Sequence, residues 1–122
     1  MKINSSIMLL VFSVAVSCTA SAPAVEDSRA EIKEMVKNNS ATLIDVRIPE
    51  QFNENSIPNA VNIPLADLAS HLDFLKSQKE VVVFCNKGIQ AKQAVEFLRK
   101  NGVENVHDGK TLDNIKAIKN EK

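Results

Sequence analysis

The segment at residues 80–91 constrains the fold of this chain more than any other. It begins with a continuous apolar run at residues 81–84, rich in β-branched side chains, which is typical of a strand buried on both faces of a parallel sheet. The run stops at Cys85, and from Ala91 onward the apolar residues recur at helical spacing. The pattern therefore predicts a buried strand, a short loop at residues 86–90 and an amphipathic helix.

This arrangement makes Cys85 a candidate nucleophile. The carboxyl end of a strand in an open α/β sheet is where loop amides and the N-terminus of a helix converge on a ligand. Their partial positive charges stabilise a thiolate, which is the reactive form of cysteine. The alternative interpretation is structural, because free cysteine is among the residues most often buried and most buried cysteines do no chemistry.

Residues 1–24 are predicted to be a secretory signal peptide. Lys2 precedes an apolar stretch at residues 7–16, which is too short for a comfortable permanent span of a bilayer. Small residues follow this stretch, and we expect cleavage after them. Residues 25–122 would then form a single periplasmic or secreted domain with no stable membrane span. The alternative is lipid attachment at Cys18, within a sequence that loosely resembles a lipoprotein box.

Composition and cysteine content narrow the function further. The chain has 15 basic residues (Lys and Arg) and 15 acidic residues, so it has no strong net field to attract a nucleic acid. Removal of the leader takes Cys18 and leaves Cys85 as the one remaining cysteine, which cannot form an internal disulfide. An unpaired thiol in an oxidising compartment favours the catalytic interpretation. His71 has no second histidine or cysteine nearby in the sequence, so we expect no metal site and no cofactor.

Strands and helices alternate along the rest of the chain. Residues 28–38 predict a helix with a capping box at its start, residues 41–47 a strand, and Pro64 the first turn of a leucine-rich helix. Residues 103–106 predict a last strand, and residues 107–109 a turn that leads into the final helix. We therefore expect one α/β domain, with a central parallel sheet of four or five strands flanked by helices on both faces.

Asp45 and Arg47 end the strand predicted at residues 41–47. Because residues two apart on a strand share a face, both should point toward the edge of the sheet that holds Cys85. We expect them to form a supporting charge network rather than to react with a substrate, since ion-pair networks often surround active sites. His107, in the turn after the last strand, is a weaker candidate for a base at the same edge.

Three segments together resemble the rhodanese homology domain. They are Leu-Ile-Asp-Val-Arg-Ile-Pro-Glu-Gln-Phe at residues 43–52, Ile-Pro-Asn-Ala-Val-Asn-Ile-Pro at residues 57–64, and Val-Phe-Cys-Asn-Lys-Gly at residues 83–88. Their order and spacing are similar to those of small, single-domain, exported sulfurtransferases. The resemblance implies a rhodanese-like fold, a monomer, and thiosulfate:cyanide sulfurtransferase activity without metal or cofactor.

The resemblance also implies roles for particular residues. Cys85 would attack the outer sulfur of thiosulfate, release sulfite and carry the sulfur as a persulfide to a thiol or cyanide acceptor. Asp45 and Arg47 would support this site. Backbone amides of the loop would bind the substrate and stabilise the persulfide anion, which needs no general base if preorganised donors face it. These loop residues are Asn86, Lys87, Gly88, Ile89 and Gln90.

The loop departs from the family pattern at one place. Rhodaneses usually carry an arginine where this chain has Ile89 or Gln90. An arginine there would bind a dianionic substrate through two hydrogen bonds, and its loss would cost roughly 1.5–3 kcal/mol. We therefore expect weak activity on thiosulfate, or a preference for another sulfane-sulfur donor such as a persulfide or polysulfide.

Other functions that use a cysteine differ from this pattern. A cysteine phosphatase of related fold needs an arginine six positions after the nucleophile, where this chain has Ala91. A thioredoxin-like oxidoreductase needs a second cysteine close by. The remaining alternative is a rhodanese-fold module that has lost catalysis and binds a partner or senses sulfur species through Cys85.

Overall fold

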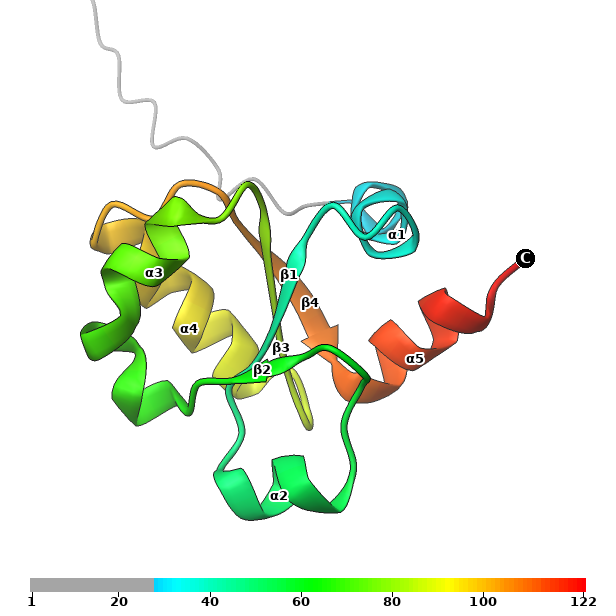
Figure 1. Cartoon of the computed structure of the whole chain (residues 1–122), viewed down its shortest axis with the longest axis horizontal. Helices are drawn as coiled ribbons and strands as arrows, with labels where there is room; N and C mark the ends of the chain where they lie inside the picture. The colour runs from blue at the N-terminus through cyan, green and yellow to red at the C-terminus, as the bar shows by residue number, and fades with distance from the viewer. Residues whose placement is uncertain (1–27) are drawn as a thin grey trace, which may run out of the picture.

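A computed structural model describes residues 28–122 of the chain as alternating strands and helices (Figure 1). The strands are β1 (Thr42–Asp45), β2 (Val61–Asn62), β3 (Val81–Cys85) and β4 (Val106–Thr111). The α-helices are α1 (Arg29–Lys37), α2 (Pro49–Glu54), α3 (Leu72–Ser77), α4 (Ile89–Lys100) and α5 (Leu112–Asn120), and a 3₁₀-helix, η1 (Leu65–His71), precedes α3. The predicted signal peptide, with Cys18, lies outside the described residues. Within residues 28–122, none of the helices has the length and apolarity needed to cross a membrane.

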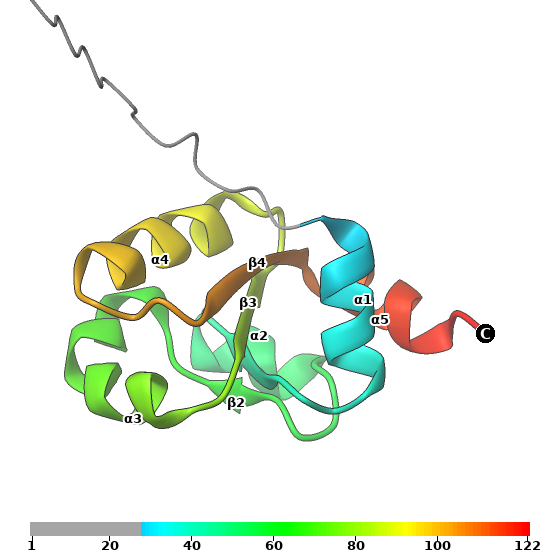
Figure 2. The same ribbon diagram turned by 90° about the horizontal axis from the view of Figure 1, so that it is seen from above.

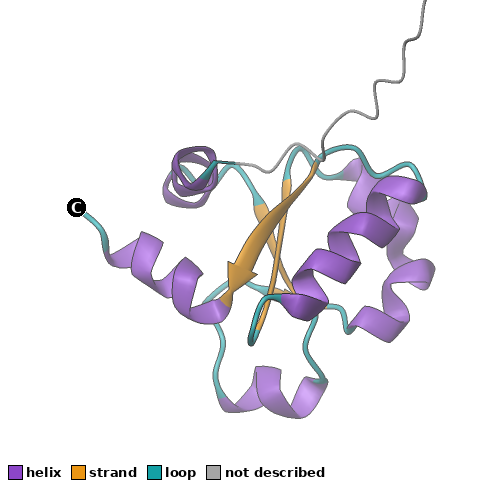
Figure 3. Ribbon diagram, turned by 180° about the vertical axis from the view of Figure 1, so that it is seen from behind, coloured by secondary structure: helices purple, strands orange, loops and turns teal. Residues whose placement is uncertain are grey.

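The four strands form one parallel sheet in the order β2-β1-β3-β4. All five residues of β3 are buried, as expected for a strand with neighbours on both sides and helices on both faces. The predicted fold class, an α/β domain with a parallel sheet of four or five strands, is confirmed. The connections place α2 beyond the carboxyl ends of the strands (Figure 3).

Two layers of helices cover the sheet, and each layer closes its own part of the core. Figure 2 shows α3 and α4 on one side of the sheet and α1 and α5 on the other. Val81, Val83 and Cys85 face the first layer, whereas Val82 and Phe84 face the second. This alternation along β3 follows from the period of two in a strand. It puts Cys85 in the same layer as the first turns of α4.

The helix starts agree with the sequence prediction in one case and differ in another. The side chain of Ser28 caps α1 by accepting a hydrogen bond from the backbone amide of Glu31 at 3.2 Å, which is one of the two hydrogen bonds of the predicted capping box. The single helix expected after Pro64 is instead a 3₁₀ stretch, η1, followed by the short helix α3. The leucines still face the core, since Leu68 and Leu75 are fully buried.

The last strand was predicted wrongly. Residues 103–106 were expected to form it and residues 107–109 to turn, but β4 runs from Val106 to Thr111. Gly109 lies in a β-bulge, where the pairing of β3 with β4 shifts register, and not in a turn. A Cβ atom at Gly109 would lie 2.6 Å from Cγ1 of Val82. The glycine therefore reflects close packing against β3, which a turn signal in the sequence does not distinguish.

His107 is also misplaced by the sequence prediction. It pairs with Val82 in β4 and its ring contacts the carboxylate of Glu80, at 2.5 Å from Nε2 to Oε2. Because Glu80 directly precedes β3, this contact lies near the amino end of the sheet. Cys85 lies at the opposite end, so the suggestion that His107 serves as a base beside Cys85 is wrong.

The close packing at Gly109 gives a stability prediction. Gly109→Ala would place a methyl group against Val82, the side chain of Ile115 and the carbonyl of Val83. We expect the free energy of unfolding to fall by about 1–3 kcal/mol, because an overfilled core must shift its neighbours. Urea denaturation would measure the loss.

A substitution at an exposed position before β4 serves as the control for this prediction. Glu104→Ala should change the free energy of unfolding by less than about 0.5 kcal/mol. If Gly109→Ala were as stable as this control, the glycine would not be required by packing.

Candidate active site

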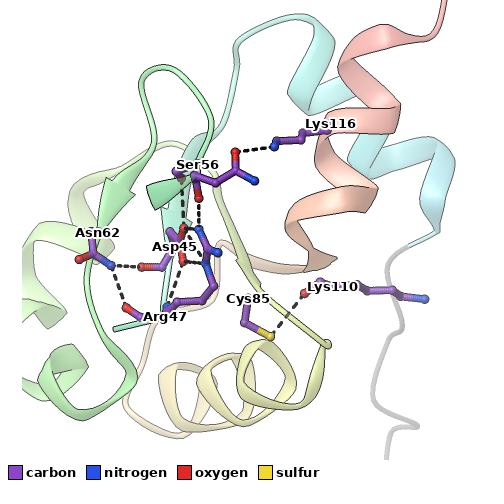
Figure 4. A network of polar contacts seen from close by, with 8 residues as sticks. Asp45, Arg47, Ser56, Asn62, Cys85, Lys110 and Lys116 are labelled. Atoms are coloured by element: carbon purple, nitrogen blue, oxygen red, sulfur yellow. Dashed lines mark hydrogen bonds and ion pairs between the residues drawn. The ribbon is translucent and has the colours of Figure 1, made fainter. Parts of the chain in front are cut away.

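Cys85 ends the central strand, and its sulfur atom is surrounded by backbone groups. The side chain is only 1% exposed. The amide N–H groups of Gly88 and Ala91 donate to Sγ at 3.0 and 3.2 Å. The carbonyl oxygen of Lys110 lies 3.6 Å from Sγ, where it accepts a hydrogen bond from the thiol (Figure 4). Two donors and one acceptor therefore converge on a single sulfur.

The start of α4 explains why these amides face the sulfur. Gly88 is the N-cap of α4 and has a φ of 91°, a left-handed conformation that glycine adopts at little cost. No side chain caps this helix, so its first amides need other partners. Ala91 is the third residue of the helix. The backbone amide at this position usually donates a hydrogen bond to the side chain of the N-cap residue. The sulfur of Cys85 thus takes the place of the missing cap.

This arrangement favours negative charge on the sulfur. The two amides are held by a helix and by a fixed glycine conformation, so they need not reorganise when charge develops. The N-terminus of α4 adds the partial positive charge of the helix dipole. The carbonyl of Lys110 acts in the opposite direction, because it interacts favourably with a thiol and unfavourably with a thiolate.

Asp45 and Arg47 form a buried ion pair beside this site. Asp45 is fully buried and Arg47 is 4% exposed. Nη2 and Nε of Arg47 donate to Oδ2 of Asp45 at 2.7 and 3.1 Å, and Nε also lies 3.0 Å from Oδ1. Hydrogen bonds from Arg47 to Asp45, together with the charge of Asp45, raise the pKa of the guanidinium above its usual value, and desolvation by burial opposes them. Arg47 is therefore permanently charged, but Asp45 compensates its charge.

The ion pair fixes the segments on either side of it. Nη2 of Arg47 also donates to the carbonyl of Asn55, just after α2, and the hydroxyl of Ser56 donates to Oδ2 of Asp45 at 3.1 Å. Nδ2 of the Asn62 side chain donates to the backbone carbonyls of both Asp45 and Arg47 at 2.9 Å (Figure 4). These contacts hold α2 and β2 against the end of β1. The geometry suits the predicted supporting role.

A pocket of about 310 Å³ opens above Cys85, between α2 and the start of α4. It brings together five of the residues that the sequence predicted for the site. Gly88 does not line the pocket, but its amide donates to the sulfur. The substrate-binding roles of these residues stay predictions. The pocket is lined by Gln51, Cys85, Asn86, Lys87, Ile89 and Gln90.

Sequence reasoning missed three parts of this site. Gln51 comes from α2, which is remote in sequence from Cys85 and carries no local signal of its own. The amide of Ala91 was missed because the helix was expected to start at Ala91, whereas α4 begins at Ile89. An earlier helix start would have identified the amide as an unpaired donor of the first turn. The carbonyl of Lys110 was hidden by the wrong assignment of the last strand.

The site contains no arrangement typical of a metal centre in the part of the chain that the structure describes. No group of three or more His, Cys, Asp and Glu side chains among these residues is placed to hold a metal ion. His71 is exposed, and its ring contacts the carbonyl of Asp67 at 2.9 Å. The chemistry available at Cys85 is that of a sulfur nucleophile and backbone amides.

Comparison with known proteins gives consistent matches to one family. Residues 28–110 match the Rhodanese-like domain family. Thiosulfate sulfurtransferase PspE of Escherichia coli is 36% identical over 74 residues, which are 59% of this chain and 71% of PspE. The crystal structure of the Alr3790 protein from Anabaena matches with a TM-score of 0.64 at 29% identity and covers 75% of each chain. A rhodanese with anions from Escherichia coli gives a TM-score of 0.55 at 34% identity, over 61% of this chain and 89% of that one.

Some relatives are much longer than the region they share with this chain. In three further curated relatives the match spans 38%, 22% and 54% of the relative's own length. The first two are larger proteins, and the likeness is to a part of each, whereas the third is about as long as this chain. The activities of those larger proteins are therefore not transferred to this chain.

The buried ion pair gives a prediction about stability. Arg47→Met would leave the carboxylate of Asp45 buried without its counter-ion and would release the carbonyl of Asn55. We expect the free energy of unfolding to fall by about 3–5 kcal/mol, because an uncompensated buried charge is strongly destabilising. Urea denaturation at neutral pH would measure the change.

The same substitution at an exposed arginine is a matched control. Arg29 pairs with Glu121 at the surface, with its side chain 52% exposed, so solvent screens the pair. Arg29→Met should therefore lose much less stability than Arg47→Met. Equal losses of unfolding free energy in the two variants would mean that the buried Asp45–Arg47 pair is no more important for stability than a surface pair.

Proposed function

The chain belongs to the Rhodanese-like domain family, and from this membership and the geometry at Cys85 we propose that it is a sulfurtransferase that carries sulfur as a Cys85 persulfide. Relatives named as sulfurtransferases support the general activity. The donor in this proposal is thiosulfate or another sulfane-sulfur compound, and the acceptor is a thiol or cyanide.

The first step forms the persulfide. The Cys85 thiolate attacks the outer sulfur of thiosulfate, the bond between the two sulfur atoms of the donor breaks, and the electron pair leaves with sulfite. Cys85 keeps the transferred sulfur as Cys–S–S⁻. The amides of Gly88 and Ala91 hold the attacking sulfur in place and stabilise its negative charge before the step.

The second step transfers the sulfur from Cys85 to an acceptor. An acceptor nucleophile attacks the outer sulfur of the persulfide, and the electron pair of the broken sulfur–sulfur bond returns to Cys85. A thiolate acceptor leaves as a persulfide, and cyanide leaves as thiocyanate. Since donor and acceptor react in separate steps through a covalent intermediate, ping-pong kinetics are expected.

The observation that carries this proposal is the pair of amide hydrogen bonds to the sulfur. An inert core cysteine lies among aliphatic side chains and needs no donors. Cys85 is part of the apolar core between the sheet and α4, but its sulfur also accepts from Gly88 and Ala91 and lines a pocket. Fixed donors at a helix N-terminus favour the thiolate, which is the reactive form of cysteine.

Export of the protein is a separate proposal that depends on residues 1–24. Cleavage after the small residues at the end of this stretch would release a periplasmic or secreted enzyme. Acylation at Cys18 would anchor it instead. N-terminal mass analysis of the exported protein would distinguish the two.

The proposed reaction predicts a covalent change at Cys85. On incubation with thiosulfate, polysulfide or an organic persulfide, the wild-type protein should gain the mass of one sulfur atom, and cyanide should remove it. Intact-mass spectrometry would measure both changes. Cys85→Ser should gain no sulfur under the same conditions, because a serine hydroxyl does not form a persulfide.

Two results would contradict this proposal. If none of the donors added sulfur to the wild-type protein, the alternative of a binding or sulfur-sensing module would be the better description. If Cys85→Ser gained sulfur as readily as the wild type, the reactive group would lie elsewhere in the chain.

A further inference from the structure

We propose that the preferred sulfur donor is an organic persulfide with an uncharged substituent, R–S–SH, and not the thiosulfate dianion. The inference rests on the proposed function and specifies which donor the pocket at Cys85 selects. Three features of that pocket carry it: its charge, its size and the side chain at its rim.

The charge on the pocket lining is small. Gln51, Asn86, Ile89 and Gln90 are uncharged, and Lys87 is the charged side chain among the residues that line the pocket. Lys87 is exposed, and a lysine is a flexible point charge that does not bind an oxyanion through two fixed hydrogen bonds. The side chains of the lining therefore offer about one full positive charge to a substrate, in addition to the partial charge at the N-terminus of α4.

Neighbouring cationic side chains add no further positive charge to the lining of this pocket. Arg47 is buried and its guanidinium is bound by the carboxylate of Asp45 and the carbonyl of Asn55. Lys116 donates to the side chain of Asn55 at 2.7 Å. Figure 4 shows the carbonyl of Lys110 directed at Cys85, whereas the side chain of Lys110 extends away from the sulfur. None of these three residues lines the pocket.

A thiosulfate reaction keeps three negative charges at the site throughout. The thiolate carries one and thiosulfate two before the step, and the persulfide carries one and sulfite two after it. Repulsion between such charges is strong where water is partly excluded. With an organic persulfide, the thiolate and the donor carry at most two negative charges in total. The limited positive charge of this pocket thus suits the organic donor better.

The size and the rim of the pocket also favour an organic donor. The pocket of about 310 Å³ leaves room beside the sulfur for a carbon substituent on the donor, which thiosulfate, with five heavy atoms, lacks. Ile89 lines this space and is 66% exposed, so an apolar side chain stands free at the first residue of α4. A carbon substituent on the donor would cover this isoleucine and remove apolar surface from water.

The reaction with such a donor balances without an additional reagent. The Cys85 thiolate attacks the outer sulfur of R–S–SH, and the sulfur–sulfur bond of the donor breaks. The electron pair leaves on the inner sulfur as R–S⁻, and the outer sulfur, with its proton, becomes the terminal atom of Cys85–S–SH. No net oxidation or reduction occurs, because one sulfur–sulfur bond replaces another.

The test compares two donors on the full-length protein. The rate constant for sulfur addition would be measured by intact mass with thiosulfate and with a hydroxyalkyl persulfide, and the rate of the Cys85→Ser protein, which retains Cys18, would be subtracted. Each value is divided by the rate constant of the same donor with a small free thiol at the same pH. The intrinsic reactivity of the donor then cancels, and the quotient reports what the protein contributes.

We expect the quotient for the hydroxyalkyl persulfide to exceed that for thiosulfate by about tenfold or more. Ile89→Arg should raise the thiosulfate quotient by about tenfold relative to Ile89→Gln, because it adds a charged fork at the rim. Ile89→Gln is the matched control, since it is polar and of similar length but uncharged. The persulfide quotient should gain no comparable factor from the arginine.

The possible failures are distinguishable. A wild-type quotient for thiosulfate equal to or above that for the persulfide would overturn the inference, whether or not the variants fold. An Ile89→Arg protein that gained no thiosulfate rate over Ile89→Gln would overturn it as well. Absence of added sulfur from both donors would instead remove the proposed function on which the inference rests.

Discussion

The two amide hydrogen bonds to Cys85 are the interaction on which the rest of the site depends. They require a strand end and a helix start within six residues of each other, since Gly88 and Ala91 donate to a sulfur only three and six positions earlier. Gly88 meets this requirement with a φ of 91°, which most other residues adopt only with strain. Ala91 meets it while its small side chain is fully buried in the core. Burial of Ala91 in the core thus fixes the start of α4, and this position directs the amides of Gly88 and Ala91 at the sulfur.

The Asp45–Arg47 pair is better understood through geometry than through stability. Burial of two charges costs desolvation energy that their attraction only partly returns, so an apolar pair of similar volume would often be as stable. What an apolar pair could not do is bond the carbonyl of Asn55 and the hydroxyl of Ser56. These directional contacts position α2, and Gln51 on α2 closes one side of the pocket. The buried charges therefore serve the shape of the site.

The sequence was informative where local patterns and core packing agree. The apolar run of β3, its end at Cys85 and the glycine before α4 could be predicted, because strand burial and helix starts have short-range signals. The parallel direction of the strands followed from their alternation with helices. The course of β4 could not be predicted, because Gly109 is required by its contact with Val82, a residue 27 positions earlier. The contribution of Gln51 was hidden for the same reason, since only the folded chain brings α2 to Cys85.

The bulge in β4 connects core packing to the chemistry at Cys85. Gly109 lies against Val82, and Lys110 follows it with a φ of 67° and places its carbonyl 3.6 Å from the sulfur. That carbonyl disfavours a bare thiolate, whereas the amides of Gly88 and Ala91 favour negative charge. In a Cys85 persulfide the negative charge lies on the outer sulfur, one bond further from the carbonyl and toward the pocket. If the proposed function is correct, the carbonyl therefore opposes the empty thiolate more than the loaded persulfide. The two amides act in the opposite direction, because they donate to Sγ itself and stabilise the charge that the empty thiolate carries there. The balance between the loaded and the empty enzyme is therefore set by opposing backbone groups at one sulfur.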